Sequence, residues 1–136
     1  MENKSEIKTT PSYSFKKDER LCSKKIIDRL FSEGQTFLAF PLKVVFLSTP
    51  LNTSSPVQAG FTVSKKNFKQ AVKRNRIKRL MREAYRLNKN ELYLELGEQQ
   101  LAVFFIYIGK EMPVYSKVES AIKKAFRQIS INLQKD

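Results

Sequence analysis

The feature that most constrains the fold is a stretch free of glycine and proline that runs from Phe68 to about Asn88. Its apolar residues recur at steps of three, four and three positions, which is the spacing of one helix face. Asn67, directly before the stretch, is a suitable helix cap. This pattern predicts a long helix with one side against a core. The residues that set the spacing are Ile77, Leu80, Ala84 and Leu87.

Apolar runs on both sides of this helix predict strands. Residues 57–64 alternate between apolar and polar side chains, as in a strand with one covered face. Residues 101–109 are almost wholly apolar, which favours a central strand covered on both faces. Pro41 interrupts an earlier apolar run, so a strand is expected to begin afresh at Leu42. We expect it to form a hairpin-like pair with residues 57–64, across a loop at residues 50–56.

Two shorter helices complete the pattern. Residues 23–33 have helical spacing, with Ser23 as the N-cap and Gly34 as a left-handed end. Near the C-terminus, Ser116 and Glu119 have the spacing of a capping box. An apolar stripe follows them and predicts a final helix. The stripe comprises Val118, Ala121, Ile122, Ala125, Ile129 and Leu133.

The order of these elements defines an α+β fold. We predict one domain over residues 19–136, preceded by a flexible N-terminal tail over residues 1–18, which is polar and has no apolar period. The domain is expected to contain a small, mostly antiparallel sheet of about four strands with three helices. Two or three strands precede the long helix, which gives the order α-β-β-β-α-β-α.

The composition excludes most catalytic chemistry. The chain has no histidine and a single cysteine, Cys22, so histidine-based nucleophile systems, an internal disulfide and a structural zinc site are all excluded. The 13 acidic residues are scattered, so no carboxylate metal site is expected. No apolar run approaches the roughly 18–20 residues of a membrane span, and residues 1–20 lack the apolar middle of a secretory signal. We expect a cytoplasmic protein with no membrane partner.

The charge distribution points to a polyanionic partner. The net charge is +13, which costs self-repulsion in the folded state unless an anion neutralises it. Between Lys65 and Lys89 lie 11 of the 26 basic residues and one acid, Glu83. Four cations follow one another there at steps of four, so like charges would oppose the isolated helix. These cations are Arg74, Lys78, Arg82 and Arg86, with Arg79 alongside.

Several classes of partner remain open at this point. A basic helix can lie on an anionic membrane or dock into an acidic protein, but those helices offer a large apolar face that this one commits to the core. A helix-turn-helix DNA reader needs a short helix before the reading helix, whereas a strand is expected here. RNA bound through its shape and phosphates fits better. Asn75 can donate to and accept from nucleotide groups.

The segment FTVSKKNFKQAVKRNRIKRLMREAYR, residues 61–86, resembles the protein subunits of bacterial ribonuclease P. Four pieces occur together at the spacing of that family: S-K-K, R-N-R, I-K-R and M-R-E-A-Y. FKKDERL at residues 15–21 and LFSEG at residues 30–34 are also similar to the family's N-terminal region. The order of elements agrees over about residues 15–133.

The resemblance implies a protein that binds a catalytic RNA, one protein per RNA. The RNA, with the Mg²⁺ that it requires, would cleave precursor tRNA to release the 5′ leader, and the protein itself would bind no cofactor firmly. The resemblance also implies a left-handed crossover around the basic helix. RNA contacts are expected at Lys65, Lys66, Arg74, Asn75, Arg76, Lys78, Arg79 and Arg82, and the charged ridge adds Arg86.

A second expected site is a cleft for the single-stranded leader. The resemblance places Phe31 among the aromatic residues of that cleft, while Ile27 stands where an aromatic is often found and Val45 belongs to the same wall. Plain core packing is an equally good interpretation of Ile27 and Phe31. The alternative function is a general RNA-binding module, such as a ribosome-associated protein, with no ribozyme partner.

Overall fold

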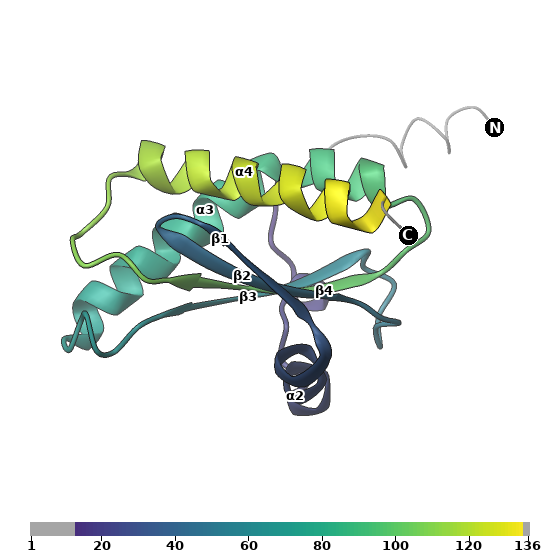
Figure 1. Ribbon diagram of the computed structural model, residues 1–136, viewed down its shortest axis with the longest axis horizontal. Helices are drawn as coiled ribbons and strands as arrows, with labels where there is room; N and C mark the ends of the chain where they lie inside the picture. Colours follow the sequence, from purple (N-terminus) through teal and green to yellow (C-terminus); the bar gives the residue numbers. More distant parts are fainter. Residues whose placement is uncertain (1–12, 135–136) are drawn as a thin grey trace.

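A four-stranded sheet carries helices on both of its faces (Figure 1). The computed structural model describes residues 13–134. Its order of elements confirms the predicted α-β-β-β-α-β-α pattern, with a short 3-10 turn in front. The elements are η1 (Lys17–Glu19), α2 (Lys24–Glu33), β1 (Gln35–Ala39), β2 (Leu42–Ser48), β3 (Val57–Val63), α3 (Ala71–Leu96), β4 (Leu101–Tyr107) and α4 (Tyr115–Gln134).

The strands lie in the order β1-β2-β4-β3. β1 with β2 and β2 with β4 are antiparallel, whereas β3 and β4 are parallel neighbours joined through α3. β4 therefore separates β2 from β3, and the predicted hairpin-like pair of these two strands is wrong. The physical reason is that β4 is apolar along its whole length. Only a central position gives such a strand a neighbouring strand at each edge and helices over both faces. The left hand of the β3-α3-β4 crossover stays a prediction.

The helices divide between the two faces of the sheet. α3 and α4 lie side by side on one face and α2 lies on the other (Figure 1). The larger core lies under α3 and α4, and the predicted stripe of α4 is buried in it from Val118 to Ile129. A smaller cluster under α2 contains Leu21, Leu30, Val45 and Ala102.

The long helix differs from its prediction at both ends and in its buried side. It begins at Ala71 after Gln70 and ends at Leu96. Asn67 does not cap it; its side-chain amide instead donates to the carbonyls of Ile108 and Gly109, at 3.1 and 3.3 Å. Leu87 is exposed, and the buried side comprises Ile77, Met81, Ala84, Tyr85, Lys89, Leu92 and Leu96. The Tyr85 ring packs among four aromatic neighbours on this buried side, and Leu87, two positions further on, lies on the opposite side of the helix.

The predicted capping box is wrong, because α4 already begins at Tyr115 and Ser116 is an exposed residue inside it. The carboxylate of Glu119 instead accepts hydrogen bonds from the Asn88 side-chain amide at 3.0 Å and the Tyr115 hydroxyl at 3.3 Å. The first of these joins α4 to α3. The bond from Asn88 is the main reason why the pKa of Glu119 lies below its usual value.

The folded domain also begins earlier than predicted. The ring of Phe15 packs edge-on against Phe61 and Tyr85, with centroids 5.8 and 5.6 Å apart. Further along, Arg20 pairs with Ala59 beside β3, and the N–H of Leu21 donates to the Ala59 carbonyl at 3.0 Å. The boundary between tail and domain therefore does not fall after residue 18. Residues 1–12 of the expected tail lie outside the described residues.

Gly34 ends α2 in a different way from the one predicted. Its φ is −75° and its ψ is 163°, which is ordinary extended backbone rather than the left-handed conformation. A Cβ atom at this position would lie 2.4 Å from the Leu30 carbonyl oxygen and 2.8 Å from that of Phe46. Glycine is therefore needed for the close approach of α2 to β2.

Replacing Gly34 with alanine is expected to destabilise the protein by about 1–3 kcal/mol, the usual cost of overpacking. Both crowded atoms belong to the backbone, so neither can turn away as a side chain would. Urea unfolding followed by circular dichroism measures the change, with the exposed Ser32→Ala on the same helix as the control. An unfolding midpoint equal to that of the unmodified protein would show that α2 and β2 can move apart to accommodate the methyl group without a loss of stability.

Candidate nucleic-acid interface

The predicted basic residues form one surface along the first half of α3 and the loop before it. Three of them are half-buried, namely Arg74, Lys78 and Arg86, and the others face solvent. Because α3 is fixed to the sheet by its buried side, it presents these cations as a rigid group. The exposed members are Lys65, Lys66, Asn75, Arg76, Arg79 and Arg82.

Arg74 has a structural role within this surface. One terminal nitrogen of its guanidinium donates to the carbonyls of Phe68 and Lys69, at 2.8 and 2.9 Å. These bonds hold the loop that leads from β3 into the helix, where Gln70 provides no side-chain cap. The other terminal nitrogen has no hydrogen-bond partner among residues 13–134, so a phosphate could bind there. Arg74 therefore positions the loop that carries Lys65 and Lys66, besides adding its own charge.

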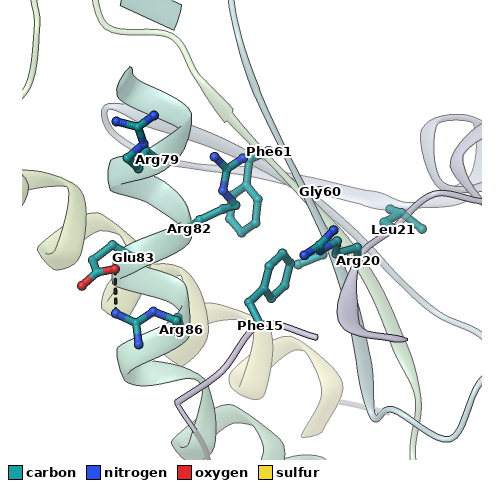
Figure 2. Close-up of a pocket in the computed structure, with 10 residues that line it drawn as sticks. Phe15, Arg20, Leu21, Gly60, Phe61, Arg79, Arg82, Glu83 and Arg86 are labelled. Carbon is teal, nitrogen blue, oxygen red and sulfur yellow. Dashed lines mark ion pairs between the residues drawn. The ribbon is translucent and has the colours of Figure 1, made fainter. Parts of the chain in front are cut away.

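A cavity of about 650 Å³ lies where α3, the edge strand β3 and the N-terminal segment meet (Figure 2). Arg79, Arg82 and Arg86 line it from α3, with the Arg82 guanidinium beside the Phe61 ring, and Arg20 lines it from the N-terminal segment. The rings of Phe15 and Phe61 line the space between these charges. Leu21, Ala59, Gly60 and Glu83 complete the lining.

The charges in this cavity are strongly unbalanced. Four guanidinium groups line it with one carboxylate, that of Glu83. Glu83 is paired with Arg86 at 2.7 Å, and Arg86 also donates to the Tyr13 carbonyl at 2.9 Å. Arg79 and Arg82 form no ion pair within the part of the chain that the structure describes. These two guanidinium groups are therefore free to bind an anion, and Arg offers a planar fork suited to phosphate.

The N-terminal wall of the cavity is fixed to α3 by a buried ion pair. Lys89 is 2% exposed, and its ammonium group bonds to the Glu19 carboxylate and to the Ser14 carbonyl. Tyr93 donates to the same carboxylate at 2.7 Å, and the Tyr85 and Tyr93 hydroxyls lie 3.0 Å apart. This network holds Phe15 and Arg20, on either side of Glu19, against the cavity.

The network also determines the charge state of Glu19. Burial alone would raise the pKa of this carboxyl, but hydrogen bonds from Lys89, Tyr93 and the Lys16 backbone outweigh that effect and lower the pKa below its usual 4.5. Burial raises the pKa of the Tyr85 and Tyr93 hydroxyls well above their ordinary range, so both stay protonated. At neutral pH the carboxyl group of Glu19 is therefore charged, while the hydroxyl groups of Tyr85 and Tyr93 are neutral.

The three residues predicted to form the leader cleft lie together on the other face of the sheet. Phe31 is 53% exposed, and its ring centroid lies 5.4 Å from that of Phe104 on β4. Ile27 is half-buried beside the same cluster. Val45 is 3% exposed under α2, so its contact with a leader stays a prediction that its burial does not favour.

Gly60 connects this face with the cavity. It lines the cavity, and a Cβ atom added to it would lie 3.0 Å from the ring of Phe104. The absence of a side chain therefore allows the Phe104 ring to sit close beside β3. Phe104 and Phe31 together present an aromatic surface on which an unpaired base could stack.

Sequence reasoning missed several residues of the site. Phe15, Arg20 and Phe61 line the cavity, and Phe104 pairs with Phe31. FKKDERL contained a signal for Phe15 alone, because this is an aromatic residue in a polar segment. Nothing in the sequence indicated that this segment returns to α3.

The arrangement is suited to binding rather than to catalysis by side chains. Guanidinium groups beside aromatic rings can neutralise phosphates and stack with bases. Within residues 13–134, no group of three or more Cys, Asp or Glu side chains is placed to hold a metal ion. None of the helices described over that range is long and apolar enough to cross a bilayer.

Comparison with known families agrees with this description. A model of the family described as Ribonuclease P matches residues 15–130. The ribonuclease P protein component of Porphyromonas gingivalis is 38% identical over 125 residues, which cover 90% of this chain and 91% of that one. The ribonuclease P protein component of Chlorobium phaeobacteroides is 35% identical over 131 residues, covering 88% and 90% of the two chains.

The fold is likewise that of solved ribonuclease P proteins. The protein from Staphylococcus aureus superposes with a TM-score of 0.66 at 18% identity, over 83% of this chain and 96% of that one. The protein from Thermotoga maritima gives a TM-score of 0.65 at 22% identity, over 81% and 96%. The match to the family model and the identity to these two relatives show that the chain belongs to the ribonuclease P protein family.

Proposed function

We propose that this protein is the protein subunit of a ribonuclease P ribozyme. It binds the catalytic RNA through the basic face of α3 and helps that RNA to remove the 5′ leader from precursor tRNA. The RNA, with its Mg²⁺, performs the chemistry, and the protein binds no cofactor of its own. One protein binds one RNA, in the cytoplasm.

The observation that carries this proposal is the cavity between α3 and the N-terminal segment. Arg79 and Arg82 line it without an ion-pair partner among the described residues, and the rings of Phe15 and Phe61 line it too. Membership of the family supplies the identity of the polyanion, which the geometry alone leaves as an RNA with accessible phosphates and bases. The chain has no histidine to act as the base for a nucleophile, which supports a binding role.

Reconstitution tests the proposal. The protein is mixed with its cognate ribonuclease P RNA, and cleavage of a 5′-labelled precursor tRNA is followed at low Mg²⁺. We expect cleavage at the junction of leader and mature tRNA with both components, and none with the protein alone. Failure of the protein to stimulate its RNA, while it binds unrelated structured RNAs equally well, would instead support a general RNA-binding module.

The exposed ring of Phe31 gives a prediction about the leader. Stacking of a base on an aromatic ring contributes about 1–3 kcal/mol, so Phe31→Ala should weaken binding of precursor tRNA to the reconstituted complex by roughly that amount. Binding of mature tRNA, which has no leader, should not change. Phe31→Tyr, which keeps the ring, is the matched control. Equal losses for precursor and mature tRNA would place Phe31 outside the leader site.

A further inference from the structure

The sheet has a second free edge, on the side away from the basic cavity. β3 and β1 are the two edge strands, and the cavity with Arg79 and Arg82 adjoins β3. Along β1, every second residue directs its backbone N–H and C=O away from β2, so the outer side of this strand has no strand partner among residues 13–134. An unpaired edge of this kind is a template for another extended chain.

A groove follows this edge between β1 and α4. Its first part, of about 360 Å³, has Phe37, Leu38 and Ala39 on one side and Lys124, Arg127, Gln128 and Ile131 on the other. A second part, of about 770 Å³, continues past the β1–β2 turn along the loop before α4. Lys124 lines both parts, so the two lie next to each other along α4, and we treat them together as the groove.

The groove combines exposed apolar side chains with a basic rim. Leu38 and Phe40 are 66% and 72% exposed, and Val114 and Ile131 are also exposed. Three of these four side chains are aliphatic. The rim carries four cations, Lys110, Lys117, Lys124 and Arg127, with Glu111 as the one acid among the lining residues.

We propose that this groove binds an extended acidic segment of a partner protein, which adds one strand to the edge of β1. Backbone hydrogen bonds would continue the sheet, as in other complexes formed by strand addition. Because side chains alternate along a strand, one row of the segment would face Ile131 and the cations of α4. Asp or Glu residues in that row would pair with Lys124 and Arg127, and apolar residues would cover Ile131 or, in the other row, Leu38.

Other occupants fit this groove less well. A second copy of the chain would bring another net charge of +13 against the same basic rim. Single-stranded RNA would satisfy the cations, but it has no repeating N–H and C=O groups to pair with β1, and of the four exposed apolar side chains only Phe40 offers a ring for a base to stack on. The inference is independent of RNA binding at α3, since the groove and the cavity adjoin opposite edges of the sheet.

A synthetic peptide tests the proposal with the full-length protein. The probe is an octapeptide of alternating valine and glutamate with blocked ends and a fluorescent label, and binding is followed by anisotropy at physiological salt. The control peptide has the same side chains and charge but carries N-methyl groups on the amides that face β1. We expect saturable binding of the first peptide and a loss of about tenfold or more for the second, since each lost hydrogen bond contributes about 0.5–1.5 kcal/mol.

Matched charge reversals locate the site. The double variant Lys124→Glu with Arg127→Glu should lower the affinity for the valine–glutamate peptide about tenfold or more. The control, Lys24→Glu with Lys25→Glu, makes an equal charge change on exposed residues of α2 and should change that affinity by no more than about twofold. Hydrogen exchange should show protection of the Thr36 and Leu38 amides in the complex. Thermal unfolding of both double variants verifies that they fold.

Four results would overturn the proposal. Equal binding of the N-methylated peptide would mean that charge alone, and not backbone pairing with β1, causes the binding. The absence of saturable binding at about 1 mM peptide would mean that the groove does not bind an extended acidic segment. Competition by oligouridylate that depends on Lys124 and Arg127 would assign the groove to RNA. A dimer in sedimentation that the same double variant abolishes would assign it to a second copy.

Discussion

Replacing Lys89 with methionine is expected to lower the free energy of unfolding by about 3–5 kcal/mol, the usual cost of removing one partner from a buried ion pair. The change would leave the Glu19 carboxylate buried without its cation, and the Ser14 carbonyl without its donor. Loss of the pair should also release the segment that carries Phe15 and Arg20. Urea unfolding measures the first effect, and limited proteolysis near Phe15 measures the second.

The control separates the loss of a charge from the loss of volume. In the double variant Lys89→Met with Glu19→Gln, no uncompensated charge is buried, so most of the stability should return. Lys73→Met, an exposed change on the same helix, should have an effect within about 0.5 kcal/mol. A small effect of Lys89→Met alone would mean that water reaches Glu19 and that the N-terminal wall of the cavity is not fixed by this pair.

The pH dependence provides an independent check on the same pair. The pKa of Glu19 is lower in the folded protein than its usual 4.5, so its contribution to stability is complete above that value. As the pH falls below 4.5 and through the folded-state pKa, the carboxylate becomes protonated and the contribution is lost. The difference in unfolding free energy between the unmodified protein and Glu19→Gln should therefore shrink on acidification.

The identity of the elements was predictable because it depends on local pattern. The alternation at residues 57–64 gave β3, the continuous apolar run gave β4, and the helical spacing gave α2, α3 and α4. The order of strands was not predictable in the same way. Residues 42–48 and 57–63 are near neighbours in sequence, yet β4, nearly forty residues later, lies between them. Strand order depends on contacts between residues that are far apart in the sequence, so the pattern of a short segment does not predict it.

The candidate site shows the same division. The basic surface of α3 was visible in the sequence, because charge at helical spacing is a local pattern. Its opposite wall was not, because Phe15 and Arg20 reach α3 through the buried pair of Glu19 and Lys89, which are 70 residues apart. The internal bonds of Arg74 were equally hidden, since a guanidinium that binds its own loop looks in sequence like one that binds a phosphate.

Replacing Arg79 and Arg82 together with alanine is expected to weaken binding to the ribonuclease P RNA by at least about tenfold at physiological salt, because charge-assisted bonds contribute about 1.5–3 kcal/mol each. Both residues line the cavity and have no ion-pair partner in the described structure, and the Arg82 guanidinium lies beside the Phe61 ring (Figure 2). Each lost phosphate contact should also reduce the slope of log K against log salt by about 0.7–0.9. Filter binding over a salt series measures both quantities.

A matched pair of substitutions distinguishes a docking site from a general attraction. Lys117→Ala with Lys123→Ala removes the same charge from exposed positions on α4. If RNA docks on α3 and in the adjoining cavity, this pair should change affinity and salt slope far less than the arginine pair. Equal losses from both pairs would mean that the RNA responds to the overall charge of +13, and that the cavity is not its docking site. The cavity accounts for binding only if charge at that position matters more than the same charge elsewhere.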